Sequence, residues 1–246
     1  MLLAIWRPRL RGRTRAELGL AALFGAVLAG MNLSFYHAIE RIPLGVGVTI
    51  EFVGPLTVAV LGSRRRLDLL WVVLALGGIL ALLHGDTHSL NRLGVALALV
   101  AGALWGFYIV INARLGRAFA DGSGLALAMC VATVLALPVG VAEAGARLIS
   151  PHVLLLGAAV GMLSSAIPYS LELEALRRIS TGVFGVLMSL EPAMAALAGF
   201  VVIGQSLGAR ELLGIGLVVV ASFGASLATR AGSARRASER ALTESQ

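Results

Sequence analysis

The sequence predicts an all-α protein, a polytopic helical bundle embedded in a membrane. Of its 246 residues, 58% are hydrophobic and 13% are charged, whereas soluble domains carry roughly one-quarter charged residues. Apolar blocks recur along the chain, and each is long enough to cross a hydrocarbon core of about 30 Å as a helix. The alternation of apolar and polar residues that is typical of a transmembrane barrel does not occur. These observations exclude an ordinary soluble domain.

The apolar blocks predict eight transmembrane helices. They are placed at residues 18–36, 42–62, 67–83, 93–111, 124–142, 153–171, 179–203 and 211–229. All basic residues are arginines: 16 lie at the termini and in loops on one side, and four (Arg41, Arg92, Arg147 and Arg210) lie on the other. Because basic loops stay in the cytoplasm, both termini are predicted to be cytoplasmic. The net charge of +7 therefore indicates orientation and not a nucleic-acid partner.

Two segments of the chain resemble each other. RIPLGVGVTIEFVGPLTVAVLG at 41–62 aligns without gaps to RISTGVFGVLMSLEPAMAALAG at 178–199, and identical residues recur in register from Arg41 with Arg178 to Gly62 with Gly199. These are the predicted second and seventh spans, which cross the membrane in opposite directions. The repeat is therefore expected to be inverted. Secondary transporters often use inverted repeats and bind substrate near the bilayer midplane, where the halves meet.

The repeat leaves the fourth and fifth spans without counterparts in the first half. We expect a complete form to have ten spans in two five-helix repeats. Here, residues 1–89 are predicted to be a partial first repeat of three spans, and residues 90–230 a second repeat of five. The opening MLLAIWRPRLRGRTR has the pattern of the last turns of a further span that leads into a cytoplasmic loop. Residues 231–246 are polar and are predicted to be a disordered cytoplasmic tail.

Four stretches resemble the EamA-like branch of the drug/metabolite transporter superfamily. They are NLSFYHAIERIPLGVGVTIEFVGPLTVAVLGSRR, GALWGFYIV, SSAIPYSLELEALRR and FGVLMSLEPAMAALAGFVVIGQSL. Within that branch they are most similar to bacterial inner-membrane exporters of threonine and homoserine. The resemblance implies ten spans in two inverted five-helix repeats and the export of small metabolites coupled to protons. Compared with that plan, we expect this chain to lack the first two helices.

Two carboxylates lie in the middle of predicted spans. A charge at the centre of a span is costly unless it pairs, faces water or takes a proton, so Glu51 and Glu191 are candidate substrate-binding residues. Each can carry a proton or pair with the ammonium group of an amino acid; the alternative is a structural carboxylate that is hydrogen-bonded to neighbouring helices. Pro55 and Pro192 follow them and are candidate hinges, because proline frees a backbone carbonyl and kinks a helix. A kink that serves only packing is the alternative.

Polar and aromatic side chains on other spans are further candidates for substrate binding. Asn32 and Tyr36 are four residues apart and share a helix face, where they would bond a substrate or a neighbouring helix. Trp105 and Tyr108 form a stripe on the fourth span, which would line a cavity or lie in an interfacial aromatic belt. Tyr169 lies on the same face of the sixth span as Ser165.

No motif indicates an enzyme, a nucleotide, a metal or a cofactor. The chain has no phosphate-binding glycine loop and no spaced nucleophile, base and orienting group. Its single cysteine excludes a disulfide within the chain. HGDTH at 84–88 is interpreted as an ordinary polar loop.

The sequence thus predicts a secondary transporter that exports small amino acids of the threonine and homoserine type across the bacterial inner membrane, coupled to protons. Its partners would be the small-molecule substrate and membrane lipid, and the oligomeric state is left open. One alternative keeps the fold and changes the cargo to another metabolite or a cationic or aromatic drug-like compound. The other alternative is a truncated membrane protein that does not transport, or a scaffold that needs a partner.

Overall fold

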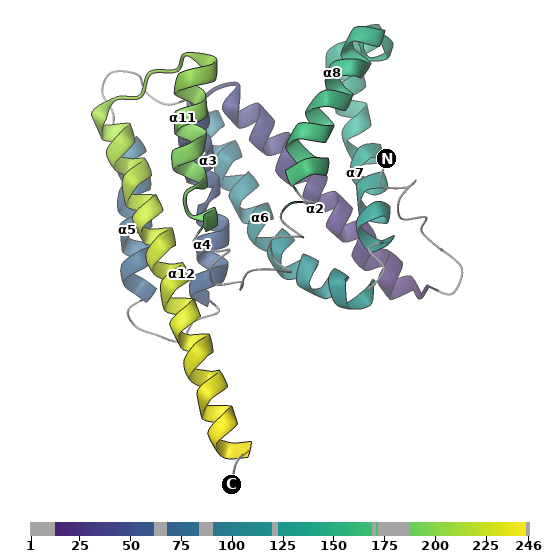
Figure 1. Cartoon of the computed structure of the whole chain (residues 1–246). Helices are drawn as coiled ribbons and strands as arrows, with labels where there is room; N and C mark the ends of the chain where they lie inside the picture. The colour runs from purple at the N-terminus through teal and green to yellow at the C-terminus, as the bar shows by residue number, and fades with distance from the viewer. Residues whose placement is uncertain are drawn as a thin grey trace.

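The computed structural model describes residues 13–61, 68–83, 91–119, 123–168, 171 and 187–244, and within these ranges all regular structure is helical. The helices are shown in Figure 1 and run α2 (Arg15–Ile39), α3 (Leu44–Glu51), α4 (Val53–Leu61), α5 (Asp68–Leu83), α6 (Arg92–Ala118), α7 (Ser123–Ala144), α8 (Pro151–Gly161), α11 (Glu191–Ile203) and α12 (Ala209–Glu244). Short helical turns, η1 (Gly145–Ile149) and η2 (Met162–Ala166), flank α8. Residues 1–12, which carry the predicted remnant of a further span, lie outside the described ranges.

Four of these helices are long and apolar enough to cross a membrane: Arg15–Ile39, Arg92–Ala118, Ser123–Ile149 and Ala209–Leu227. Shorter apolar helices occupy Leu44–Val58, Pro151–Ser164 and Glu191–Ile203. An all-α membrane protein is therefore confirmed, and each of the eight apolar blocks contains helix. Eight complete spans stay a prediction.

Side-chain caps fix where three of the helices begin. Thr14 and Glu17 form a reciprocal capping box at the start of α2, in which the Thr14 hydroxyl accepts from the Glu17 N–H. Asn91 accepts from Gly94 N–H at the start of α6, and Ser150 accepts from Val153 N–H before α8. Each cap satisfies one of the backbone donors that a helix start leaves without an intrahelical partner.

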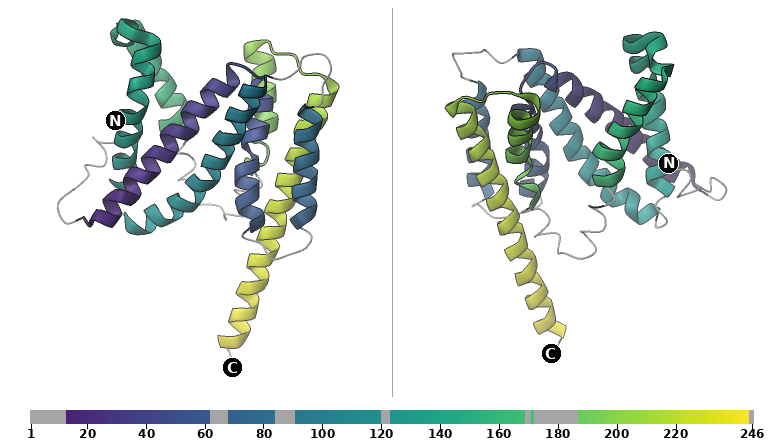
Figure 2. Two further views of the ribbon diagram at one scale, coloured as in Figure 1. Left: turned by 180° about the vertical axis from the view of Figure 1, so that it is seen from behind. Right: turned by 45° about the horizontal axis from the view of Figure 1, so that its top comes forward.

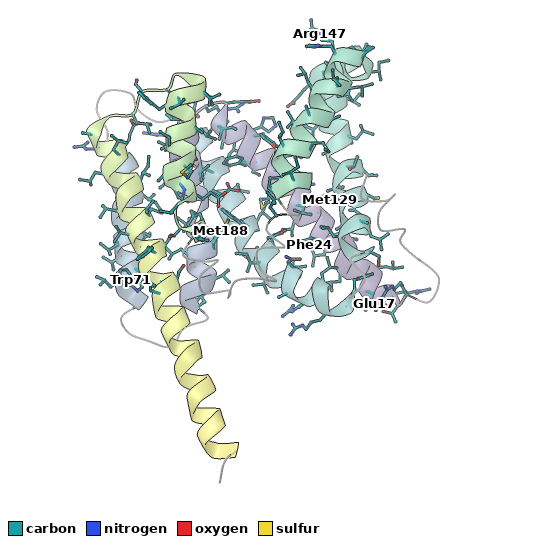
Figure 3. All side chains as sticks on the ribbon, in the orientation of Figure 1. Glu17, Phe24, Trp71, Met129, Arg147 and Met188 are labelled. Carbon is teal, nitrogen blue, oxygen red and sulfur yellow. The ribbon has the colours of Figure 1, made fainter. Side chains whose placement is uncertain are left out.

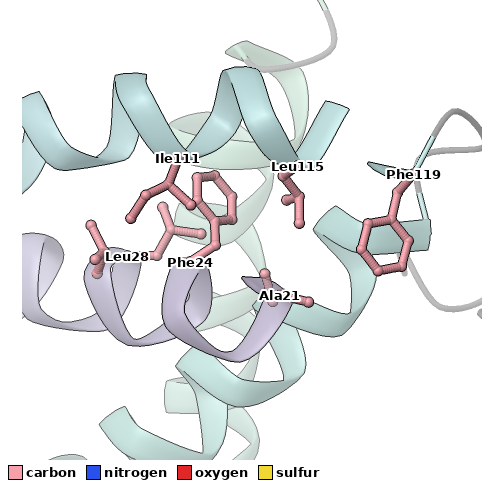
Figure 4. Packing of buried hydrophobic residues seen from close by; sticks show 8 residues of the cluster. Ala21, Phe24, Leu28, Ile111, Leu115 and Phe119 are labelled. Carbon is pink, nitrogen blue, oxygen red and sulfur yellow. The ribbon is translucent and has the colours of Figure 1, made fainter. Parts of the chain in front are cut away.

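The long helices α2, α6 and α7 pack together through a buried apolar cluster (Figure 4). Phe24 on α2 is 0% exposed and lies among Leu28, Ile111 and Leu115. Its ring stacks on Tyr108 of α6 with 5.0 Å between the centroids. Large interdigitated side chains therefore define this contact, and it acts as a scaffold.

On the other side of the bundle, α5 packs along α12 (Figure 2). Ala75 and Ile79 of α5 and Val218, Ala221 and Ala225 of α12 form the buried cluster between them. Beyond the bundle, α12 continues as a projecting helix through the segment that composition predicts to be a disordered tail. Its alanines and arginines are good helix formers, and its disorder in solution stays a prediction.

Both segments of the sequence repeat contain an interrupted helix. In the first, α3 ends at Glu51, Phe52 forms a turn, and α4 begins at Val53. In the second, the turn is at Ser189 and Leu190, and α11 begins at Glu191. The gap-free alignment pairs Phe52 with Ser189, so the interruptions fall at matching positions. A proline follows each of them in register, which accounts for the lost helical bonding.

Candidate functional site

The antiparallel helices α3 and α11 meet through small residues. The buried residues of α11 are Pro192, Ala196 and Gly199, whose spacing of four and three places them on one helix face. A Cβ on Gly45 of α3 would lie 2.6 Å from the Ala196 Cα, and one on Gly199 would lie 3.7 Å from the Leu44 Cβ. We call Gly45, Pro192, Ala196 and Gly199 the small-residue seam. Their size lets the two backbones approach closely.

The two predicted carboxylates lie at the other end of the same helix pair. Glu51 is the last residue of α3, and Glu191 is the first residue of α11. Glu51 is 8% exposed, so it lies inside the bundle and does not face lipid. Its carboxylate lies within range of the charge of Glu191, which is partly buried. The fold therefore brings together two acids that lie 140 residues apart in the chain.

This pair can bind a cation. Two carboxylates whose charges interact inside an apolar bundle repel, and a buried charge that no partner compensates is expensive. A proton or an ammonium group between them removes the repulsion and supplies charge-assisted hydrogen bonds.

Helix α6 supports the backbone around Glu51. Pro55 has no N–H to donate to the Glu51 carbonyl, which lies four residues earlier. That carbonyl oxygen instead lies against Gly102, where a Cβ would be 2.6 Å from it. Gly54 of α4 also lies against the backbone of Gly102 and Gly106. The glycines of α6 thus let the Glu51 carbonyl and Gly54 pack closely against the α6 backbone.

The predicted aromatic stripe of α6 divides between two environments. Trp105 packs edge-to-face on Phe52, the residue after Glu51, with 5.5 Å between the ring centroids and 86° between their planes. Tyr108 instead stacks on Phe24 in the α2–α6 cluster. Trp105 therefore packs on the residue that follows Glu51, at the apolar cluster of α4, α5 and α12, while Tyr108 packs in the cluster of α2, α6 and α7.

The other predicted substrate-binding residues are Asn32, Tyr36 and Tyr169. Asn32 and Tyr36 lie on an exposed stretch of α2, and the Asn32 amide donates to the Leu28 carbonyl of its own helix at 2.9 Å. Tyr169 and the loop HGDTH lie outside the described residues. Within the described ranges, no group of three or more histidine, cysteine or acidic side chains comes together to hold a metal ion.

The two acids do not occupy matching positions of the sequence repeat. The repeat pairs Glu51 with Met188, and Met188 packs against the apolar cluster of α4, α5 and α12, just before α11 (Figure 3). The second acid lies three residues later, at the start of α11. Sequence reasoning did not identify Gly54, Gly102 or Phe52 as part of the site; the glycine spacing in AGALWGF was the available signal.

The EamA-like transporter family matches residues 92–227, which is more than half of the chain. The chain belongs to this family. The helical bundle agrees with that assignment, and membership makes the protein a multi-pass membrane transporter and not an enzyme. The family resemblance seen in the sequence is thereby confirmed.

Sequence identity to individual proteins extends the comparison. The chain is 42% identical to the threonine/homoserine exporter RhtA of Escherichia coli strain K12, over 94% of this chain and 78% of that protein. It is 41% identical to the exporter of the same name from Salmonella typhimurium strain LT2 over the same shares. An uncharacterized protein of Pseudomonas aeruginosa, PA1977, is 31% identical over 89% of this chain and 75% of its own length. No solved structure matches the chain.

Proposed function

We propose that this EamA-like transporter exports small amino acids of the threonine and homoserine type across the bacterial inner membrane. The observation that carries the proposal is the placement of Glu51 and Glu191 at the interrupted ends of α3 and α11, within range of each other's charge. An amino acid carries an ammonium group, which is the kind of ligand that a carboxylate pair binds. The 42% identity to an exporter named for threonine and homoserine supports the choice of cargo.

The same pair offers a route for proton coupling. The two acids favour holding one cation between them, because two charged carboxylates with no cation between them repel each other. A proton and a substrate ammonium group would then compete for the pair. Exchange of one for the other would link outward movement of the amino acid to inward movement of protons.

The architecture that we propose follows the arginine distribution and the repeat. Eight spans, both termini in the cytoplasm, and two inverted repeats bounded at 1–89 and 90–230 would place the carboxylates near the bilayer midplane. Matching helix interruptions at Phe52 and Ser189 support the repeat. Trp105 would add an apolar wall to the site, and Asn32 and Tyr36 would supply polar contacts to the substrate.

An efflux assay tests the function. Cells or vesicles loaded with labelled threonine or homoserine are compared for the unaltered chain, Glu51→Gln and Glu191→Gln, at matched protein levels. Loss of either charge removes a charge-assisted contact, and we expect efflux to fall by about tenfold or more. Imposing a pH gradient across the vesicles should change the efflux of the unaltered chain only.

Glu143→Gln is the matched control, because the Glu143 side chain is 59% exposed at the end of α7. It should export as the unaltered chain does. Equal efflux from Glu51→Gln would remove that residue from the site. Flux of cationic or aromatic compounds in place of amino acids would favour the alternative cargo, and no flux beside an active relative would favour a chain that does not transport.

A further inference from the structure

Gln205 connects two distant parts of the chain beside the small-residue seam. Its side-chain oxygen accepts a hydrogen bond from the Leu44 N–H at 3.0 Å, between residues 161 positions apart. Leu44 is the first residue of α3, and Pro43 before it makes no side-chain cap. Gln205 therefore satisfies a donor at the start of α3 that the helix itself leaves open.

The turn after α11 is built to present this side chain. Gly204 takes a left-handed conformation at φ 73°, which glycine adopts without a steric cost. The following Gln205 N–H bonds back to the Gly199 carbonyl at 3.0 Å. A Cβ on Gly199 would lie 2.7 Å from the Gln205 side-chain oxygen, so the absence of a side chain there makes room for the amide.

This cross-link and the carboxylates lie at opposite ends of the same helix pair. Seven residues separate Leu44 from Glu51, which places them two turns apart on one face of α3. On α11, Gly199 lies two turns from Glu191. Between them, Gly45 packs on Ala196. A contact that fixes one end of this short pair also fixes the separation of the acids at the other end.

Resting on the proposed function, we infer that Gln205 is a positioning residue of the exporter. It clamps the outer end of α3 to the outer end of α11, holds Glu51 beside Glu191, and closes the outer route between the two helices. Opening toward the outside requires this one hydrogen bond to break and the small-residue seam to separate. The clamp thus opposes outward opening with a contact weak enough to break in every transport cycle.

Thiol labelling measures the clamp directly. The native Cys130 is replaced by serine, and Thr49→Cys is introduced on α3, where Thr49 is 0% exposed. A membrane-impermeant maleimide is then added from outside. Gln205→Leu keeps the side-chain size and removes the acceptor, so labelling should accelerate by about threefold to tenfold. Gln205→Glu keeps an acceptor oxygen, so it should label at the parent rate.

Gly199→Ala provides a second variant that leaves Gln205 in place. The added methyl displaces only the end of a flexible side chain, so the chain should fold with an unchanged melting temperature and show the faster labelling of Gln205→Leu. A cysteine at the exposed Ala209 should label equally in all variants and so controls for access. Equal labelling of the thiol introduced by Thr49→Cys in the parent and in Gln205→Leu, or faster labelling in Gln205→Glu as well, would overturn the clamp.

The labelling does not depend on any substrate. If Glu51→Gln exports normally while Gln205→Leu still accelerates labelling, the proposed function fails and the clamp stands. If Glu51→Gln abolishes export while the labelling rates are all equal, the function stands and the clamp fails.

Discussion

The contact of α2 with α6 and the contact of α3 with α11 are built in opposite ways. The first joins unbroken helices of 25 and 27 residues through stacked rings and buried aliphatic side chains. The second joins helices of 8 and 13 residues through glycine, alanine and proline. Interdigitated side chains resist sliding because every shift opens voids, whereas a smooth seam of small residues separates with little repacking. The difference indicates a fixed scaffold beside a pair of helices that can move.

The largest loss is expected from Gly45→Leu, which fills the small-residue seam. The new side chain must push α11 away, since a Cβ there would already lie 2.6 Å from the Ala196 Cα. We expect export to fall to background while the protein still inserts, because overpacking costs about 1–3 kcal/mol. Gly77→Leu on α5 is the control, since nothing lies within 4 Å of a Cβ at that position. Efflux and protein level are measured together.

A double substitution sharpens this test. Gly45→Ala should reduce export less than the leucine variant, and adding Ala196→Gly should recover part of the loss by removing the Ala196 Cβ, 2.7 Å from the new methyl. Such a cycle isolates the coupling between neighbouring residues. Purely additive effects of the two substitutions would contradict a direct contact across the small-residue seam.

A smaller loss, of stability and not of transport, is expected when the scaffold is weakened. Phe24→Ala leaves a void in a cluster where the ring is 0% exposed, at a cost of about 3 kcal/mol. The melting temperature in detergent should fall, while efflux per folded molecule stays close to that of the unaltered chain. Phe107→Ala on α6 is the control, because its ring is 61% exposed and leaves no buried void. A Phe24 variant with normal stability and no export would reverse the roles of the two contacts.

The sequence predicted well those features that depend on a single span. Glu51 and Glu191 were identifiable because a carboxylate within an apolar run is costly, and Pro55 and Pro192 because a proline removes a helical hydrogen bond. Both signals are local to a single span. The family resemblance rested on short motifs of the same kind and is confirmed.

Features that depend on two spans could not be predicted in this way. The four-residue spacing of Gly102 and Gly106 indicates a close helix contact, but nothing in the sequence says that Gly102 lies against the Glu51 carbonyl. Trp105 and Tyr108 share a stripe, yet the rings that face them lie in different parts of the bundle: Phe52 in the turn between α3 and α4, and Phe24 on α2. Gln205 lies in a polar turn, and only the fold places it at the start of α3. The repeat supplied a partial signal, since Gly45 and Ala196 are both among its identical positions and pack on each other.

The smallest effect is expected at the polar end of the scaffold. Glu40, which follows α2, lies 3.4 Å from His37 Nδ1, and the other ring nitrogen of His37 lies 3.4 Å from Glu143 of α7. The hydrogen bond with His37, and then the one with Arg41, holds the pKa of Glu40 below its ordinary value of 4.5. A lowered pKa means that the carboxylate stabilises the fold above that value and loses its effect as the pH falls through the folded pKa.

Glu40→Gln should therefore lower the melting temperature slightly at about pH 6, and the difference from the parent should shrink as the pH falls and the parent carboxylate takes up its proton. The effect is small because the Glu40 side chain is 61% exposed and water screens its contacts. Melting curves of the parent and the variant from neutral to acidic pH measure the difference. If Glu40→Gln destabilised the protein as much as Phe24→Ala, the scaffold would depend on its polar ends and not on the buried rings, and its contrast with the small-residue seam would disappear.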